Sequence, residues 1–221
     1  MSTTRAPELQ QSADGLSRNN SRGGSAYEMR PLATDAERAE AAALVEDRLG
    51  WLAHRGLPVP CRGDVPALYR DDQAESVGLF EDGVLLSCLL LDRHPDLGHW
   101  GTEGIGRSLL LSHTHTLPGR SDNVVWLVTL WASDYAARLD LPHVRSETPA
   151  RHALDVDPIA RFLNRLQHMG WEARGSGPGT NGERVARLEL RSKVYPRLTP
   201  FIRCTVPLTP QVESRTDRSA P

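Results

Sequence analysis

The feature that most constrains this chain is an Asp-Gly pair set between two apolar runs. Asp82-Gly83 follows Ser76–Phe80 closely and directly precedes Val84–Leu91. Such a pair favours the tight turn whose twist matches two antiparallel strands. We therefore expect a β-hairpin, and a hairpin argues against a purely parallel, doubly wound sheet.

A helix is expected before the hairpin. Thr34 and Glu37 have the spacing of a capping box, and apolar residues then recur at helical spacing as far as Gly56. The following Leu57–Pro60 must be extended, because proline disfavours helical backbone in the residue before it. A short strand at Tyr27–Leu32 precedes the helix, and a loop links the helix to the hairpin.

The rest of the chain alternates between strands and helices. The expected elements are a strand at Ser108–Thr116, a long helix after Gly119, a strand at His143–Thr148, a helix opened by Asp157-Pro158, a glycine-rich bend at Gly175–Gly182 and a strand at Val185–Leu190. This order predicts an α/β (α+β) fold with a mostly antiparallel mixed sheet of about six to seven strands flanked by helices.

Composition indicates one globular domain with irregular ends. The chain has 221 residues, of which 39% are hydrophobic and 24% charged, and this is enough to bury a core. We interpret 1–26 as a disordered tail, 27–194 as the folded domain and 195–221 as a C-terminal extension that ends in a disordered tail. Within the extension, Phe201–Val206 can add an edge strand, and such a strand could pair across a homodimer.

Charge and cysteine content argue against several classes of function. A net charge of −2 lacks the basic excess that a nucleic-acid partner requires, and no apolar run approaches the roughly 20 residues of a membrane span. Cys61, Cys88 and Cys204 are too few and too widely spaced for a disulfide framework or a metal knuckle. We expect a cytoplasmic protein without nucleic-acid or membrane partners.

The order of the elements and several local strings resemble the GNAT superfamily of acyl-CoA-dependent N-acyltransferases over about Tyr27–Ser192. Arg120–Val125 stands where members carry (Arg/Gln)-x-x-Gly-x-(Gly/Ala), between the fourth strand and a long helix. Asn123 and Val125 replace the family's small residues, so this acyl-CoA-binding loop is a degenerate version. The other similar strings are Trp131-Ala132, Met169-Gly170-Trp171 and Trp51-Leu52-Ala53-His54-Arg55-Gly56.

The resemblance implies an N-acetyltransferase that uses acetyl-CoA as co-substrate. The acetyl group would pass to a primary amine of a small molecule or peptide by direct attack in a ternary complex. The diphosphate would lie on the free N–H groups that open the long helix, where the helix also carries partial positive charge. The cofactor residues so implied are His115, Thr116, Leu117, Arg120, Asp122, Asn123, Val124, Val125 and Trp126.

Two histidines are the candidate catalytic residues. In a regular strand His113 and His115 point to the same face, and either could take a proton from the acceptor amine. Many members of the family use a tyrosine as acid, but Leu166 stands at its place here. The two imidazoles could instead hold a metal as a pair, although no third ligand is identified, or they could simply face a wet side of the sheet.

Trp51, Trp100 and Glu147 are the candidate residues for the acceptor site. The two indoles lie beside predicted loops and the carboxylate lies near a strand end. Packing of the indoles and solvation of the carboxylate are the structural alternatives. A second glycine pattern, Gly101-x-x-Gly104-x-Gly106, lacks a strand before it and a long helix after it, so we interpret it as a flexible loop.

A different functional class also fits the sequence. The loop at Arg120–Val125 lacks the family's small residues, and the tyrosine that many members use as general acid is also absent. The chain could therefore be a GNAT-like module that binds acyl-CoA or regulates a partner without transferring the acyl group. Binding of acetyl-CoA without turnover of any amine would separate this alternative from the enzyme.

Overall fold

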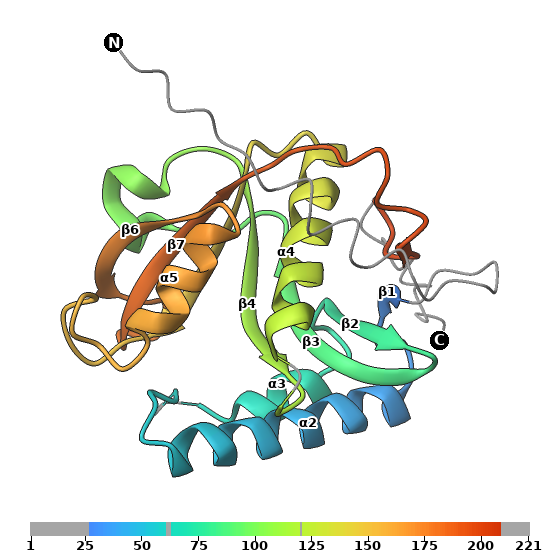
Figure 1. Cartoon of the computed structure of the whole chain (residues 1–221), viewed down its shortest axis with the longest axis horizontal. Coiled ribbons are helices and arrows are strands. Elements are labelled where there is room, and N and C mark those ends of the chain that lie inside the picture. The colour runs from blue at the N-terminus through green and yellow to red at the C-terminus, as the bar shows by residue number, and fades with distance from the viewer. Residues whose placement is uncertain (1–26, 61–62, 120, 209–221) are drawn as a thin grey trace, which may run out of the picture.

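The computed structural model describes residues 27–60, 63–119 and 121–208. These residues form one eight-stranded mixed sheet with helices on both faces (Figure 1), in the order β6-β7-β5-β4-β3-β2-β1-β8. The elements are β1 (Tyr27–Pro31), α2 (Asp35–His54), α3 (Val65–Arg70), β2 (Ser76–Glu81), β3 (Val84–Asp92), the 3-10 segment η2 (Gly98–Gly104), β4 (Ser108–Thr116), α4 (Ser121–Arg138), β5 (His143–Pro149), α5 (Ala160–His168), β6 (Trp171–Pro178), β7 (Arg184–Arg191) and β8 (Ile202–Cys204).

The hairpin and the first long helix form as predicted. β2 and β3 pair antiparallel, and the turn residues Asp82 and Gly83 both have positive φ, at 50° and 83°. The Thr34 hydroxyl accepts the N–H of Glu37, whose carboxylate in turn accepts the N–H of Thr34. Two short sequence signals therefore determine where β3 and α2 begin.

An additional α-helix and an additional strand were not expected from the sequence. α3 interrupts the predicted loop between α2 and β2. β6 begins directly after Gly170 and runs through much of the predicted glycine-rich bend, so that prediction is wrong for 175–178 and the sheet has eight strands instead of six to seven. The sequence of β6 hides it, because its second half is Gly-Ser-Gly-Pro and lacks apolar alternation.

The predicted start of α5 also needs correction. The helix begins at Ala160, and its N-cap position is Ile159, without a side-chain cap. The Asp157 carboxylate instead accepts the N–H groups of Arg151, His152 and Ile159, at 2.7, 2.7 and 3.1 Å. Asp157 therefore fixes the whole loop between β5 and α5.

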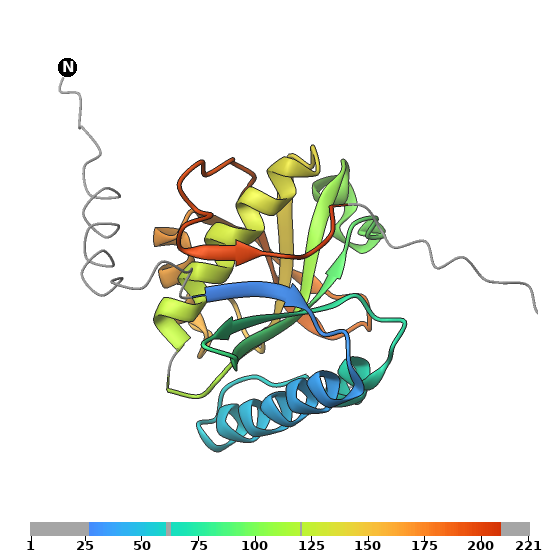
Figure 2. The ribbon, with the colours of Figure 1, turned by 90° about the vertical axis from the view of Figure 1, so that its right-hand side faces the viewer.

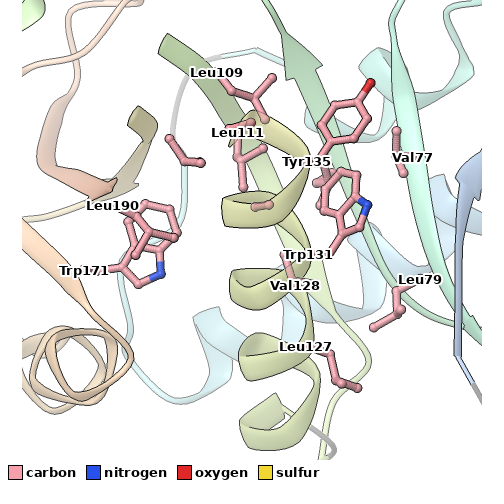
Figure 3. Packing of buried hydrophobic residues seen from close by; sticks show 14 of the residues in the cluster. Val77, Leu79, Leu109, Leu111, Leu127, Val128, Trp131, Tyr135, Trp171 and Leu190 are labelled. Atoms are coloured by element: carbon pink, nitrogen blue, oxygen red, sulfur yellow. The ribbon is translucent and has the colours of Figure 1, made fainter. Parts of the chain in front are cut away.

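Helices cover the two faces of the sheet with separate cores. α2 and α3 pack on β2 and β3 through Ala41, Val45 and Tyr69, which are fully buried. On the other face, the predicted apolar face of α4 packs against the sheet, and Trp131 stacks on Tyr135 with ring centroids 5.1 Å apart (Figure 3). This larger core continues to α5 and Trp171, which stands beside Leu190 in the same view.

The C-terminal extension packs on the body of the protein. β8 lies within the stretch for which an edge strand was predicted, and it pairs in parallel with β1 of the same chain (Figure 2). Trp131 Nε1 donates to Cys204 Sγ at 3.3 Å, and Tyr135 Oη donates to the Pro207 carbonyl at 2.6 Å. The predicted tails at 1–26 and beyond 208 lie outside the described residues, as does Cys61.

Candidate functional site

β4 and β5 are parallel neighbours that separate part-way along their length. Ser108–Leu111 pairs with His143–Ser146, and the Ser146 hydroxyl donates to the Leu111 carbonyl at 2.8 Å where this pairing ends. Beyond that point β4 pairs with β3, and β5 pairs with β7. One edge of Ser112–Thr116 therefore faces the opening between the strands. Openings at the carboxyl ends of parallel strands are common ligand sites.

A β-bulge in β4 lies at this opening. His115 is opposite Cys88 but Ser112 is opposite Leu90, so β4 carries one extra residue. His113 has a φ of 49°, which is rare for a residue with a side chain. The hydroxyl of Tyr69, a fully buried residue of α3, donates to the His113 carbonyl. The unexpected helix α3 thus holds the bulge in its strained conformation.

The prediction that His113 and His115 point to the same face assumed a regular strand, and the bulge between Ser112 and His115 removes that regularity. His115 faces the α2 core opposite Cys88, and its side chain is buried with Nε2 unpaired. Burial, the nearby His113 and the charge of Arg48 lower the pKa of His115 to about 3, so it is a poor base at neutral pH.

His113 has a different environment. Burial lowers the pKa of His113 below 6.5, whereas the carboxylates of Glu147 and Glu183 oppose this change. The ring of His113 is therefore neutral at pH 7.

The structure brings together two of the three predicted acceptor residues. Trp100 Nε1 donates to Glu147 Oε1 at 2.7 Å, and His99 Nε2 lies 2.6 Å from the same oxygen. Arg187 donates to the His99 carbonyl at 2.6 Å, while Arg145 donates to the carbonyl of Gly104 at 2.8 Å. These bonds fix the loop between β3 and β4 over β5 and β7.

The second glycine pattern lies in this same loop and is anchored rather than flexible. A side chain at Gly104 would place its Cβ 2.2 Å from the Leu97 carbonyl oxygen, so glycine is required there for packing. Arg145 binds the carbonyls of Gly104 and Ile105, which are acceptors. A phosphate cradle needs N–H donors, and these carbonyls supply none.

The predicted cofactor loop coincides with the start of α4. Gly119, at φ 86°, turns the chain into a helix that begins at Ser121. Asn123 and Val125 therefore lie inside α4, and neither has positive φ. Glycine is not required at either position for the helix to begin here.

The remaining predicted cofactor residues differ in exposure. Asn123 is exposed and Val124 is buried, while Val125, Trp126 and Leu117 are half-buried. His115 and Thr116 are buried. Arg120 and the side chain of Asp122 lie outside the described part of the chain.

Comparison with known proteins identifies the fold. No family model and no curated protein matches the sequence. Among solved structures, a GNAT-family acetyltransferase from Streptococcus agalactiae matches with a TM-score of 0.54 at 15% identity, over 76% of this chain and 96% of that one. FeeM, an N-acyl amino acid synthase from uncultured soil microbes, matches with a TM-score of 0.51 at 15% identity, over 75% and 90%. The chain has the GNAT fold.

Another matching structure is that of yncA from Salmonella typhimurium, which is described as an acetyltransferase with its cofactor acetyl-CoA. It has a TM-score of 0.44 at 11% identity and covers 78% of this chain and 97% of that one.

Sequence reasoning missed the residues that α2 and α3 contribute to the site. Tyr69 gave no signal of its own, although Asp64-Val65-Pro66 is a helix-start pattern that could have revealed α3. Trp51, the third predicted acceptor residue, contacts its neighbours in the chain: the guanidinium carbons of Arg48 and Arg55 lie 4.4 and 4.2 Å from the centroid of its ring. Arg48 itself was not a candidate.

Two further observations concern metals and membranes. In residues 27–60, 63–119 and 121–208, no three His, Cys, Asp or Glu side chains gather as a metal site, so His113 and His115 find no third ligand there. None of the helices in those ranges combines the length and apolar character needed to cross a bilayer.

Proposed function

We propose that this protein is an N-acyltransferase that transfers the acetyl group of acetyl-CoA to a primary amine. The observation that carries the proposal is the open edge of β4 beyond Leu111, with a bulge at His113 held by Tyr69. The fold supports the class of reaction, because the S. agalactiae protein is an acetyltransferase and FeeM is an N-acyl amino acid synthase.

The residues around the opening fit an acyl-CoA. Ser112–Thr116 offers backbone N–H and C=O groups for the amides of the pantetheine arm, because β5 does not use this edge. The N–H groups that open α4 have no partners within the helix and suit a diphosphate. Bound there, acetyl-CoA supplies a thioester whose C–S bond breaks as the acceptor nitrogen forms the amide.

His113 and Glu147 act on the acceptor amine. Glu147, fixed by Trp100 and His99, attracts the positively charged amine to the opening. His113 is neutral at pH 7 because burial lowers its pKa, and it accepts the proton that the nitrogen loses on attack. The charged amine first loses one proton to solvent, which leaves the lone pair that attacks the thioester; the released sulfur then takes up one proton, so the overall reaction releases one proton. Leu166 is apolar and buried, so the proton on the sulfur comes from His113 or from solvent.

The test is release of CoA from acetyl-CoA, measured by chromatography with a panel of primary amines. We expect turnover with some of them, and we expect His113→Gln to reduce kcat by about 100-fold. The exposed His94 provides the control, since His94→Gln should leave kcat unchanged. The fall in kcat below pH 6.5 should be present in the wild type and absent in His113→Gln. Tight acetyl-CoA binding without turnover of any amine would contradict the transferase and favour a binding or regulatory module.

A further inference from the structure

Arg48 is an arginine on the buried side of α2 without an acidic partner among the residues that the structure describes. It follows Ala41 and Val45 at helical spacing, and both of these residues are fully buried. Its Nη1 is buried without a hydrogen-bond partner, and among the described residues no carboxylate acts on its charge. Leaving a buried charged donor unpaired is costly, so this group is suited to an oxyanion from outside the chain.

A second unpaired polar atom belongs to the strand beneath α2. His115 is only 8% exposed, and its Nε2 is buried without a partner. α2 packs on β4, and Arg48 Nη1 and His115 Nε2 are both buried between these elements; the charge of Arg48 is also among the causes that lower the pKa of His115. A neutral imidazole can carry its hydrogen on Nε2 and donate it. Arg48 and His115 therefore form a pair of unused donors.

The end of α2 lies beside the opening between β4 and β5. α2 packs on β3 and β4, and the C-terminal half of α2 runs below the lower end of β4 in Figure 1. Directly after α2, the carbonyls of Gly56 and Leu57 accept hydrogen bonds from Arg151, which follows β5. The end of α2 and the residues that follow it thus reach from β4 to the end of β5.

Trp51 holds the guanidinium in place. The Arg48 guanidinium carbon lies 4.4 Å from the Trp51 ring centroid, a distance typical of a cation–π contact. A planar guanidinium with fixed orientation is well suited to bind a carboxylate through paired N–H groups.

We propose that Arg48 Nη1 and His115 Nε2 bind the carboxylate of the acceptor, so that the acceptor is an amino acid. This inference rests on the proposed function. The amine of the acceptor lies at His113 and Glu147, and its carboxylate lies under α2. The two histidines of β4 thereby have separate roles, one toward the reacting nitrogen and one toward the carboxylate.

The test compares two product analogues that differ by the carboxylate, N-acetylphenylalanine and N-acetylphenethylamine. Calorimetry with the full chain, with and without CoA, should show at least about tenfold tighter binding of N-acetylphenylalanine, as expected for a hydrogen bond between charged groups. Arg48→Gln should abolish this difference, and Arg48→Lys should retain part of it. Arg55→Gln is the matched control, because Arg55 stacks on the same indole but is exposed.

The outcomes separate this inference from the function on which it rests. Equal binding of the two analogues by the wild type, or equal weakening of both by Arg48→Gln, would overturn the carboxylate site even where acetyl-CoA binds. Failure of acetyl-CoA to bind would overturn the proposed function, while the titrations without CoA still test the site. Thermal unfolding of each variant shows whether a loss of binding follows from a loss of folding, and Arg48→Lys keeps the inference testable in that case.

Discussion

Replacing Tyr69 with phenylalanine tests whether α3 controls the reactive part of β4. The substitution removes one hydroxyl from a fully buried ring and keeps the rest of its packing. That hydroxyl donates to the carbonyl of His113. Burial raises the pKa of Tyr69 well above its usual range, so the hydroxyl remains a donor throughout the pH range of an assay.

The expected cost in stability is modest, and the expected cost in activity is larger. A lost hydrogen bond and an unpaired buried carbonyl together cost about 1–3 kcal/mol. The released bulge can then relax from the φ of 49° at His113, which moves the imidazole. A displacement of about 1 Å at a reacting group can reduce the rate about 100-fold. We therefore expect Tyr69→Phe to lower kcat by roughly 10- to 100-fold.

Tyr135 provides a matched control. It is also buried, and its hydroxyl donates to the Pro207 carbonyl at 2.6 Å and accepts from Arg93 at 2.6 Å, on the α4 side of the sheet. Urea unfolding should show similar losses of stability for Tyr69→Phe and Tyr135→Phe. Steady-state kinetics should show a reduced kcat for Tyr69→Phe alone. Equal kcat values in the two variants would refute the role assigned to α3.

Three further predictions concern His115, Gly119 and Asp157. The pKa of His115 is about 3 in the folded chain and 6.5 when unperturbed, so the unfolded chain binds more protons between these two pH values. The free energy of unfolding should therefore fall by up to about 1.4 kcal/mol per pH unit below pH 6.5. Urea unfolding of His115→Gln should show a flatter dependence on pH. Gly119→Ala should lower the free energy of unfolding by about 1–2 kcal/mol, because φ is 86° at this residue, and it should weaken acetyl-CoA binding in calorimetry. Gly50→Ala is the control: Gly50 is exposed within α2, and alanine should stabilise the helix slightly. Asp157→Ala should lower the free energy of unfolding by about 1–3 kcal/mol, because the N–H groups of Arg151, His152 and Ile159 lose their acceptor. A free energy of unfolding equal to that of the wild type, measured with urea, would contradict that role.

The same Asp157 contacts also make stability depend on pH, but here hydrogen bonds and not burial lower the pKa. Burial alone would raise the pKa of this carboxyl, but the backbone N–H donors of His152, Ile159 and Arg151 lower it overall. Its contribution to stability is therefore complete above the unfolded pKa of about 4 and is lost as the pH falls through the lower folded pKa. Loss of stability from His115 begins at a higher pH, so the two groups can be separated by unfolding at graded pH.

Local signals in the sequence were sufficient for much of the fold. The capping box at Thr34 and the turn at Asp82-Gly83 each act within a few residues, and their elements form where expected. β6 could not be found in this way, because its glycines and serine carry no apolar period and its strand character comes from pairing with β7.

The site was less predictable because distant contacts define it. The relation between His113 and His115 depends on a bulge, and the bulge depends on a hydroxyl 44 residues away at Tyr69. Trp100 and Glu147 were separate candidates in the sequence, and the hydrogen bond between them spans 47 residues. Sequence spacing identified several of the relevant residue types, but their mutual arrangement required the structure.

The most direct test of the proposed acyl-CoA site is a crystal structure of this protein grown with CoA. We predict that the pantetheine arm lies along the open edge of Ser112–Thr116 and that the diphosphate lies on the N–H groups at the start of α4. An empty opening at millimolar CoA, or CoA bound at another surface, would contradict the assignment of this opening as the catalytic cleft.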